Sequence, residues 1–239
     1  MRRVVRGFWG PRAESAEALA VRWKQTLDRL AGLLPAAGPG TAGPWTWQQA
    51  HEVGAATVLS ADEASLLTAL RAEQAADGWS DRTGYGLSLS IENEAGWEVE
   101  VRGSAGGASE FVLQSVILGI SVPEGAQLPA AELLALVAEE WAPDFGDVTD
   151  DDVLDALEDE ADFIIGEPSV GWCGYLSPAR AALVPDDLTA ARKELPDGGV
   201  LFDIAAPSTD TDTVVETYVR LREAGALEPL PTPMDRSML

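Results

Sequence analysis

The sequence predicts a single α+β domain in which helices pack on a mainly antiparallel sheet. The first observation is a series of strand-like stretches at 85–92, 97–103 and 110–122, because consecutive strands joined by short turns pair antiparallel. The second is that stretches with helical spacing of apolar residues lie on both sides of this meander. The third is size, since 239 residues with 46% hydrophobic content can bury one substantial core.

The part of the chain before the meander predicts one strand and two helices. Residues 3–9 form an apolar-rich strand that a Gly-Pro pair ends. Residues 14–34 carry an apolar stripe at every fourth position and end before a proline. Ser60 and Glu63 have capping-box spacing and open a helix that runs to about residue 76.

The elements expected after the meander are a helix over 129–142, a helix over 150–163 capped by Thr149, a strand over 171–176, a short helix over 186–194, a strand over 199–205 and a helix over 210–224. The Pro- and Gly-rich stretch 35–44 predicts a loop, and 93–96 predicts a hairpin turn. Residues 228–239 are expected to be a disordered tail, so the predicted domain spans residues 1–227.

Acidic residues are concentrated in one segment. The net charge is −24, and 13 of the 29 residues at 139–167 are Asp or Glu, with no Lys or Arg among them. This balance argues against nucleic acid and anionic membrane as partners, because phosphate groups are bound by Lys and Arg. It favours a cationic protein as partner.

A helical wheel of this segment separates its charges from its apolar residues. The inner face is predicted to carry Val153, Leu154, Leu157, Ala161 and Ile164. The outer face carries the residues predicted to contact a partner, Asp151, Asp155, Glu158, Asp159 and Asp162, with Asp144 and Asp147 as a rim. The alternative is that the face is only solvated, as most charge runs are.

Few residues suit catalysis or metal binding. The chain has one His, His51, and one Cys, Cys173, and it lacks HExxH and CxxC spacing. We therefore expect no metal and no cofactor, although a Cys/His or metal-dependent hydrolase stays open as an alternative. A single Cys excludes an internal disulfide and suits the cytoplasm, and no apolar run is long enough to span a membrane.

Three tryptophans lie in short strings bounded by turn residues. The strings are Trp9-Gly-Pro-Arg12 followed by Glu14-Ser15, Trp141-Ala-Pro-Asp144, and Gly171-Trp172 with Tyr175-Leu-Ser177. Core packing is the favoured interpretation of the aromatic residues, although Trp141, Trp172 and Tyr175 are also candidate anchors for a partner.

In this order and at these intervals, the strings resemble the immunity protein 52 family of bacterial polymorphic toxin systems, over about residues 3–225. The resemblance implies a cytoplasmic α+β protein without catalytic residues, which binds a cognate toxin that is often a restriction-endonuclease-like nuclease. The acidic helix lies between the strings and is not part of them, so it is expected to determine which toxin is recognised.

The leading hypothesis is therefore an inhibitor that captures a basic toxin through an acidic surface. Two alternatives belong to other classes: a small hydrolase that uses His51 or Cys173, and an acidic adaptor domain with no toxin partner.

Overall fold

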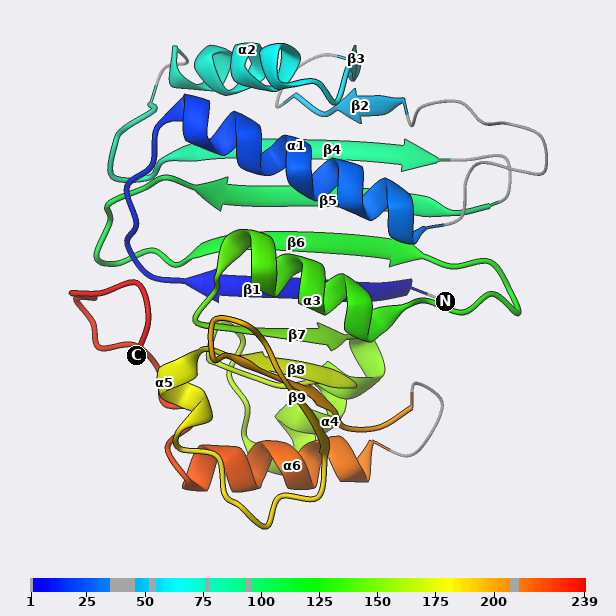
Figure 1. The fold of residues 1–239 in the computed structure, drawn as a ribbon, viewed down its shortest axis with the longest axis vertical. Coiled ribbons are helices and arrows are strands. Elements are labelled where there is room, and N and C mark those ends of the chain that lie inside the picture. Colours follow the sequence, from blue (N-terminus) through cyan, green and yellow to red (C-terminus); the bar gives the residue numbers. More distant parts are fainter. Residues whose placement is uncertain (1, 35–45, 52–54, 76–77, 93–95, 207–210) are drawn as a thin grey trace.

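The computed structural model describes residues 2–34, 46–51, 55–75, 78–92, 96–206 and 211–239. Within these residues one antiparallel sheet has ten strands in the order β3-β2-β4-β5-β6-β1-β7-β8-β10-β9 (Figure 1). The predicted α+β fold is confirmed. The predicted loop at 35–44 lies outside the described residues, as does most of the predicted turn at 93–96.

The strands are β1 (Arg2–Trp9), β2 (Trp47–Gln49), β3 (Thr57–Leu59), β4 (Tyr85–Glu92), β5 (Glu98–Ala105), β6 (Gln114–Ser121), β7 (Phe145–Thr149), β8 (Cys173–Leu176), β9 (Ala191–Glu194) and β10 (Val200–Asp203). The helices are α1 (Ala16–Leu33), α2 (Glu63–Gln74), α3 (Ala130–Trp141), α4 (Asp151–Ala161), α5 (Pro178–Ala181) and α6 (Asp212–Glu223).

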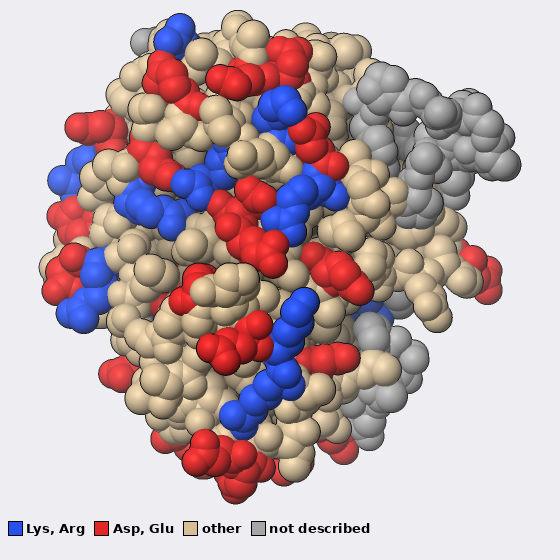
Figure 2. Space-filling view, in the orientation of Figure 1, with Lys and Arg blue, Asp and Glu red and all other residues tan. Residues whose placement is uncertain are grey.

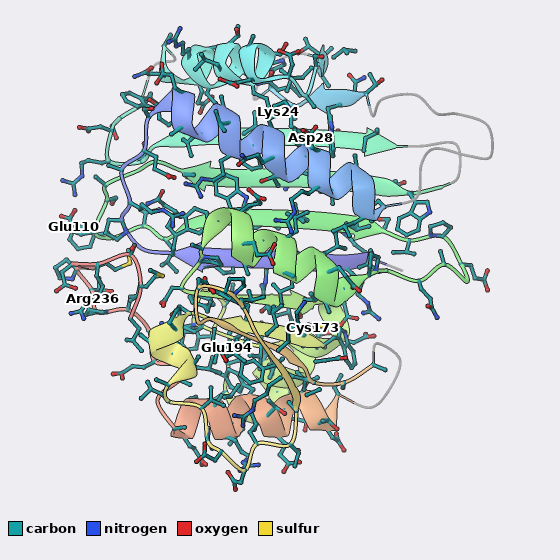
Figure 3. The ribbon with its side chains drawn as sticks, viewed as in Figure 1. Lys24, Asp28, Glu110, Cys173, Glu194 and Arg236 are labelled. Carbon is teal, nitrogen blue, oxygen red and sulfur yellow. The ribbon has the colours of Figure 1, made fainter. Side chains whose placement is uncertain are left out.

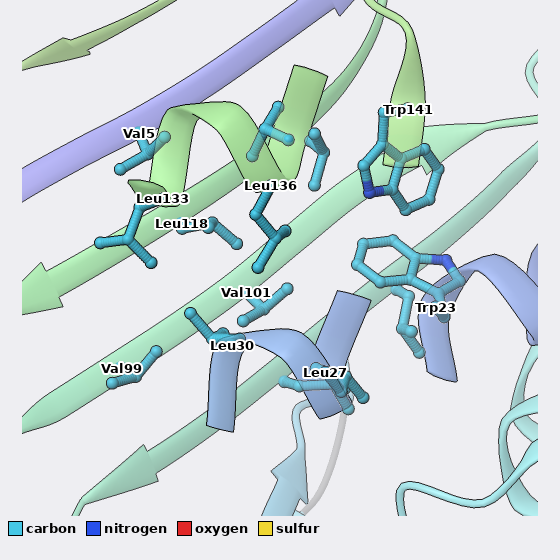
Figure 4. Packing of buried hydrophobic residues seen from close by; sticks show 14 of the residues in the cluster. Val5, Trp23, Leu27, Leu30, Val99, Val101, Leu118, Leu133, Leu136 and Trp141 are labelled. Carbon is cyan, nitrogen blue, oxygen red and sulfur yellow. The ribbon is translucent and has the colours of Figure 1, made fainter. Parts of the chain in front are cut away.

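Helices cover the two faces of the sheet at different places. Helices α1 and α3 lie side by side across the face shown in Figure 1, while α4 lies behind the sheet and α6 along its lower end. The α1 and α3 side holds the larger apolar cluster, in which leucines of both helices meet valines of β1 and β5 (Figure 4). The α4 and α6 side holds a second cluster over β7, β8 and β10.

The predicted meander is confirmed by the strand register. Leu89 of β4 lies opposite Val101 of β5, and Val101 lies opposite Leu118 of β6. These side chains face the helices and are buried. On the other side of the same strands, Ser88 and Arg102 are partly or fully exposed, which is why the alternation was visible in the sequence.

Four elements differ from the prediction. The chain between α3 and α4 forms β7, which was not predicted and is a central strand that pairs with β1 and β8. Residues 186–194 were expected to be helical, whereas Ala191–Glu194 is an edge strand paired with β10. The short elements β3 and α5 were not predicted. In each case pairing or packing with distant residues overrides the local pattern.

The C-terminal residues are ordered, contrary to the expected disordered tail. Gly10 N–H donates to the Ser237 carbonyl at 2.9 Å, and Met234 N–H donates to the Glu110 carbonyl at 2.7 Å. Leu230 and Met234 are buried. Figure 3 shows Arg236 beside the turn that carries Glu110. Residues 228–239 therefore pack on the same domain.

Candidate protein-binding surface

Helix α4 begins at an aspartate that holds three elements together. Asp150 is the N-cap, and its Oδ1 accepts from Val153 N–H at 3.0 Å, a role that had been expected of Thr149. Its Oδ2 accepts from Trp172 Nε1 at 3.0 Å and forms an ion pair with the buried Arg3. The start of α4 is therefore fixed to β1 and to the segment before β8.

The inner face of α4 packs on α6. Val153, Leu157 and Ala161 are buried in the second apolar cluster together with Tyr218. The helix ends at Ala161, because Asp162 adopts a left-handed conformation with φ of 52°. Ile164 was expected on the inner face, but the early end of the helix turns it outward.

The outer face of α4 is an anionic surface whose carboxylates form no ion pair with a described cation, although Asp152 is near enough to Arg3 for their charges to attract. We use the name acidic surface for its exposed side chains Asp151, Asp152, Asp155, Glu158, Asp159, Glu160 and Asp162. In the part of the chain that the structure describes, none of them forms an ion pair with Lys or Arg. The helix dipole favours Asp151 and Asp152 in the first turn, but it disfavours carboxylates near the last turn.

Asp144 had been predicted to belong to an exposed rim, but it does not. It is fully buried and forms an ion pair with the equally buried Arg180, with Nη2 and Oδ2 2.7 Å apart. Its Oδ1 accepts from Ser177 Oγ and from Leu239 N–H, both at 3.0 Å. Arg180 also donates to the Ala226 carbonyl at 2.8 Å. Asp144 therefore joins α5, the segment after α6 and the tail, and is unavailable to a partner.

Asp147 is also buried, so the prediction that it belongs to the rim is wrong for the same reason. It lies opposite Arg6 in the β1–β7 register and accepts from Arg6 Nε at 2.8 Å and Nη2 at 2.6 Å. Ser169 Oγ donates to it at 2.7 Å. Together Asp144, Asp147 and Asp150 form an aspartate row in and beside β7, and each pairs with an arginine.

The acidic segment 139–167 thus has two parts with different roles. Glu139 and Glu140 both pair with Arg29 of α1, at 2.6 and 2.7 Å. Figure 2 shows this face, with acidic and basic side chains intermixed over α1 and α3. The aspartate row is paired one to one with arginines and the two glutamates share Arg29, whereas the carboxylates of α4 form no ion pair with a described cation. The excess charge of the segment is therefore on the α4 side.

The predicted aromatic anchors Trp141, Trp172 and Tyr175 are core residues. Each is buried, so the prediction that they contact a partner is wrong for the folded chain, while the core interpretation is confirmed. Trp172 is held by Asp150. Burial, followed by the charge and hydrogen bond of Asp197, raises the pKa of Tyr175.

The three tryptophan-containing strings are joined at one end of the sheet. Trp9 stacks on Trp141 with ring centroids 5.6 Å apart, and Trp23 meets Trp141 edge to face at 4.7 Å (Figure 4). Arg12 Nη2 donates to the Trp141 carbonyl at 2.7 Å, at the end of α3. Ser177 of the third string reaches Asp144 of the second. The strings are therefore linked through packing and hydrogen bonds, as residues that hold the fold.

The geometry does not assemble a Cys/His dyad. Cys173 lies in β8 within the body of the molecule (Figure 3), six strand positions away from β2, which precedes His51. At about 4.8 Å per strand this is a separation of roughly 25–30 Å. Burial, aided by the charges of Asp203 and Glu132, raises the pKa of Cys173 to about 12, so its reactive thiolate is scarce at neutral pH.

His51 lies beside a groove between α2 and the sheet. His51 Nε2 lies 2.8 Å from Thr57 Oγ1, and both side chains are exposed. This groove of about 1300 Å³ is lined by His51, Glu73 and Arg102. Among the described residues, no three His, Cys, Asp or Glu side chains are grouped so that they could hold a metal ion.

No protein-family model matches the chain, and no curated protein matches it. The resemblance to the immunity protein 52 family therefore stays a prediction. No helix in the described part of the chain is long and apolar enough to cross a membrane.

Sequence reasoning missed one exposed feature beside the acidic surface. Ile164 and Ile165 lie three and four residues after the end of α4 and are 63% and 76% exposed. A sequence signal existed, because Gly166 after two β-branched residues favours a turn rather than a continued helix.

Proposed function

We propose that this chain is an immunity protein, which neutralises a cationic toxin of the nuclease class by binding it through the acidic surface of α4. The observation that carries the proposal is the row of exposed carboxylates on one helix, none of which forms an ion pair with a described cation. A nuclease binds phosphate groups through Lys and Arg, so its substrate groove attracts such a surface. We place this binding in the cytoplasm, where the nucleic acid to be protected lies.

The carboxylates support the proposal through their number and through the helix stability that is lost to their mutual repulsion. Like charges three and four residues apart on a helix destabilise it by about 0.2–0.5 kcal/mol per pair. Within α4, Asp155 forms four such pairs, and the carboxylates involved form no ion pair with a described cation; its partners are Asp151, Asp152, Glu158 and Asp159. A surface that serves only solubility does not require this arrangement, whereas a surface that steers a cationic partner gains association rate from it.

The test begins with the product of the gene that neighbours this one. The chain is expected to rescue cells that express that protein and to bind an inactivated form of it in vitro. The variant Asp155→Lys, Glu158→Lys, Asp159→Lys should lower the association rate at least about tenfold at low salt, with a smaller difference at high salt.

The matched control reverses three exposed acids on other elements, Glu124, Asp186 and Glu228. It changes the net charge equally, so a much smaller loss of association rate in the control separates the acidic surface from net charge alone. If the α4 variant binds and protects as the original chain does, the acidic surface has no part in inhibition. If the original chain does not bind the neighbouring product, the adaptor alternative is favoured.

A further inference from the structure

An apolar pair is held outward at the end of α4. Glu167 N–H donates to the Ile164 carbonyl at 3.0 Å, and Gly166 has a φ of 102°, so residues 164–167 form a tight turn. The turn is fixed on both sides. Phe163 before it is buried, with its ring 5.9 Å from that of Tyr218, and residues 168–170 after it are buried.

Isoleucine is an unusual residue for such a position. Turn tips normally carry Gly, Pro, Asn, Asp or Ser, which either adopt the required backbone angles or bond to the local backbone. The side chains of Ile164 and Ile165 have no polar atom to bond to the backbone, and they stay 63% and 76% exposed although the neighbouring backbone is anchored. Folding of the chain alone does not account for two adjacent apolar side chains in this place.

Charge determines what can cover this pair. Asp162 precedes it by two residues and Glu167 follows it by two, with the rest of the acidic surface behind Asp162. The described cation at this end of the helix, Arg222, reaches from α6 to the Ala161 carbonyl. A second copy of this chain would bring the same carboxylates to the contact and be repelled, as would an anionic membrane.

We propose that Ile164 and Ile165 are the apolar anchor of the interface, and that they insert into an apolar pocket bordered by Lys and Arg on a cationic protein. The inference rests on the proposed function and adds the kind of pocket that the toxin must have. An apolar centre with a charged rim is the usual anatomy of a specific interface. The two parts then have separate tasks: the acidic surface accelerates association, and the isoleucine pair slows dissociation.

The test measures binding rates to the inactivated product of the neighbouring gene, at low and at high salt. Ile164→Ser with Ile165→Ser should raise the dissociation rate at least about tenfold at both salt concentrations and change the association rate less than about twofold. The conservative Ile164→Val with Ile165→Val should retain most of the affinity. Unfolding in urea shows whether each variant is folded.

The matched control is the other described pair of adjacent exposed large hydrophobic residues, Phe111 and Val112, at 61% and 48% exposure. Their replacement by Ser should leave both rates unchanged. If the original chain binds and the isoleucine variant dissociates at the original rate, the anchor is wrong while the proposed function stands. If the original chain does not bind at all, both proposals fail. A dimer of the original chain that the isoleucine variant abolishes in sedimentation experiments also overturns the anchor.

Discussion

At the scale of single residues, the aspartate row shows how one segment can carry acidic residues for two purposes. Asp144, Asp147 and Asp150 lie three residues apart and are oriented into the molecule, where arginines from β1 and α5 meet them. Composition alone does not distinguish these carboxylates from those on α4. The distinction depends on Arg3, Arg6 and Arg180, which come from distant parts of the chain.

The Asp144–Arg180 pair gives a residue-scale prediction. Asp144→Ala leaves Arg180 buried without its counter-charge, so the free energy of unfolding should fall by about 3–5 kcal/mol. The double variant Asp144→Leu, Arg180→Met should recover much of this loss, because no charge is then left buried. Urea unfolding checks both.

The exposed pair Asp235–Arg236 is the control for that experiment. Asp235→Ala should give no measurable change, because solvent already screens the pair. A loss of stability after Asp144→Ala no larger than that of the control would mean that the buried ion pair does not stabilise the fold.

At the scale of elements, repulsion between like charges lowers the stability of helix α4. Asp159 repels Asp155 and Asp162, which are four residues before it and three after it. Asp159→Lys turns this repulsion into attraction and places a cation near the helix C-terminus. We expect the free energy of unfolding to rise by about 0.5–1 kcal/mol at low salt, and by less in 1 M NaCl. The same variant should bind the toxin more weakly, if the proposed function holds.

Asp151→Lys is the counterpart at the other end of the helix. It also turns repulsion from Asp155 into attraction, but Asp151 lies in the first turn of α4, where the helix dipole favours a carboxylate, so stability should rise less than after Asp159→Lys. Urea unfolding at two salt concentrations measures both variants. Equal effects of the two substitutions would show that position along the helix does not matter, and would contradict this account.

The elements also show what the sequence could and could not predict. Strands β4 and β5 were predictable because one face is buried and the other exposed, which imposes alternation. Strand β7 was hidden because both of its faces are buried, and the partner that makes Asp147 acceptable, Arg6, is 141 residues away. The acidic surface could be predicted from the helical period, but the turn that exposes Ile164 depends on a left-handed Asp162.

At the scale of the whole molecule, two apolar clusters share the same central strands. In β1, Val5 faces the α1–α3 cluster while Phe8 packs against the α4–α6 cluster, and in β8 Tyr175 and Leu176 divide in the same way. If one of these strands unfolds, both clusters lose packing partners. The chain should therefore unfold as one cooperative unit.

Leu157→Ala tests this coupling. Leu157 is buried in the α4–α6 cluster, so its truncation should cost about 2–5 kcal/mol. In a Trp172→Phe background seven tryptophans remain, and the six described ones all lie in or against the other cluster, so the fluorescence reports largely on that cluster. We expect Leu157→Ala to lower the urea midpoint of that fluorescence as much as the midpoint of circular dichroism. An unshifted fluorescence midpoint would mean two independent folding units.

The position of β1 has a consequence for the synthesis of this chain. Strand β1 is translated before the other described strands, yet it lies between β6, which ends at Ser121, and β7, which ends at Thr149. At about 5–20 residues per second, a ribosome needs roughly 7–28 s to pass from Trp9 to Thr149. During that time Val5 and Trp9 leave the ribosome without their final neighbours, so the nascent chain depends on chaperones or on transient contacts with α1 until the centre of the sheet can close.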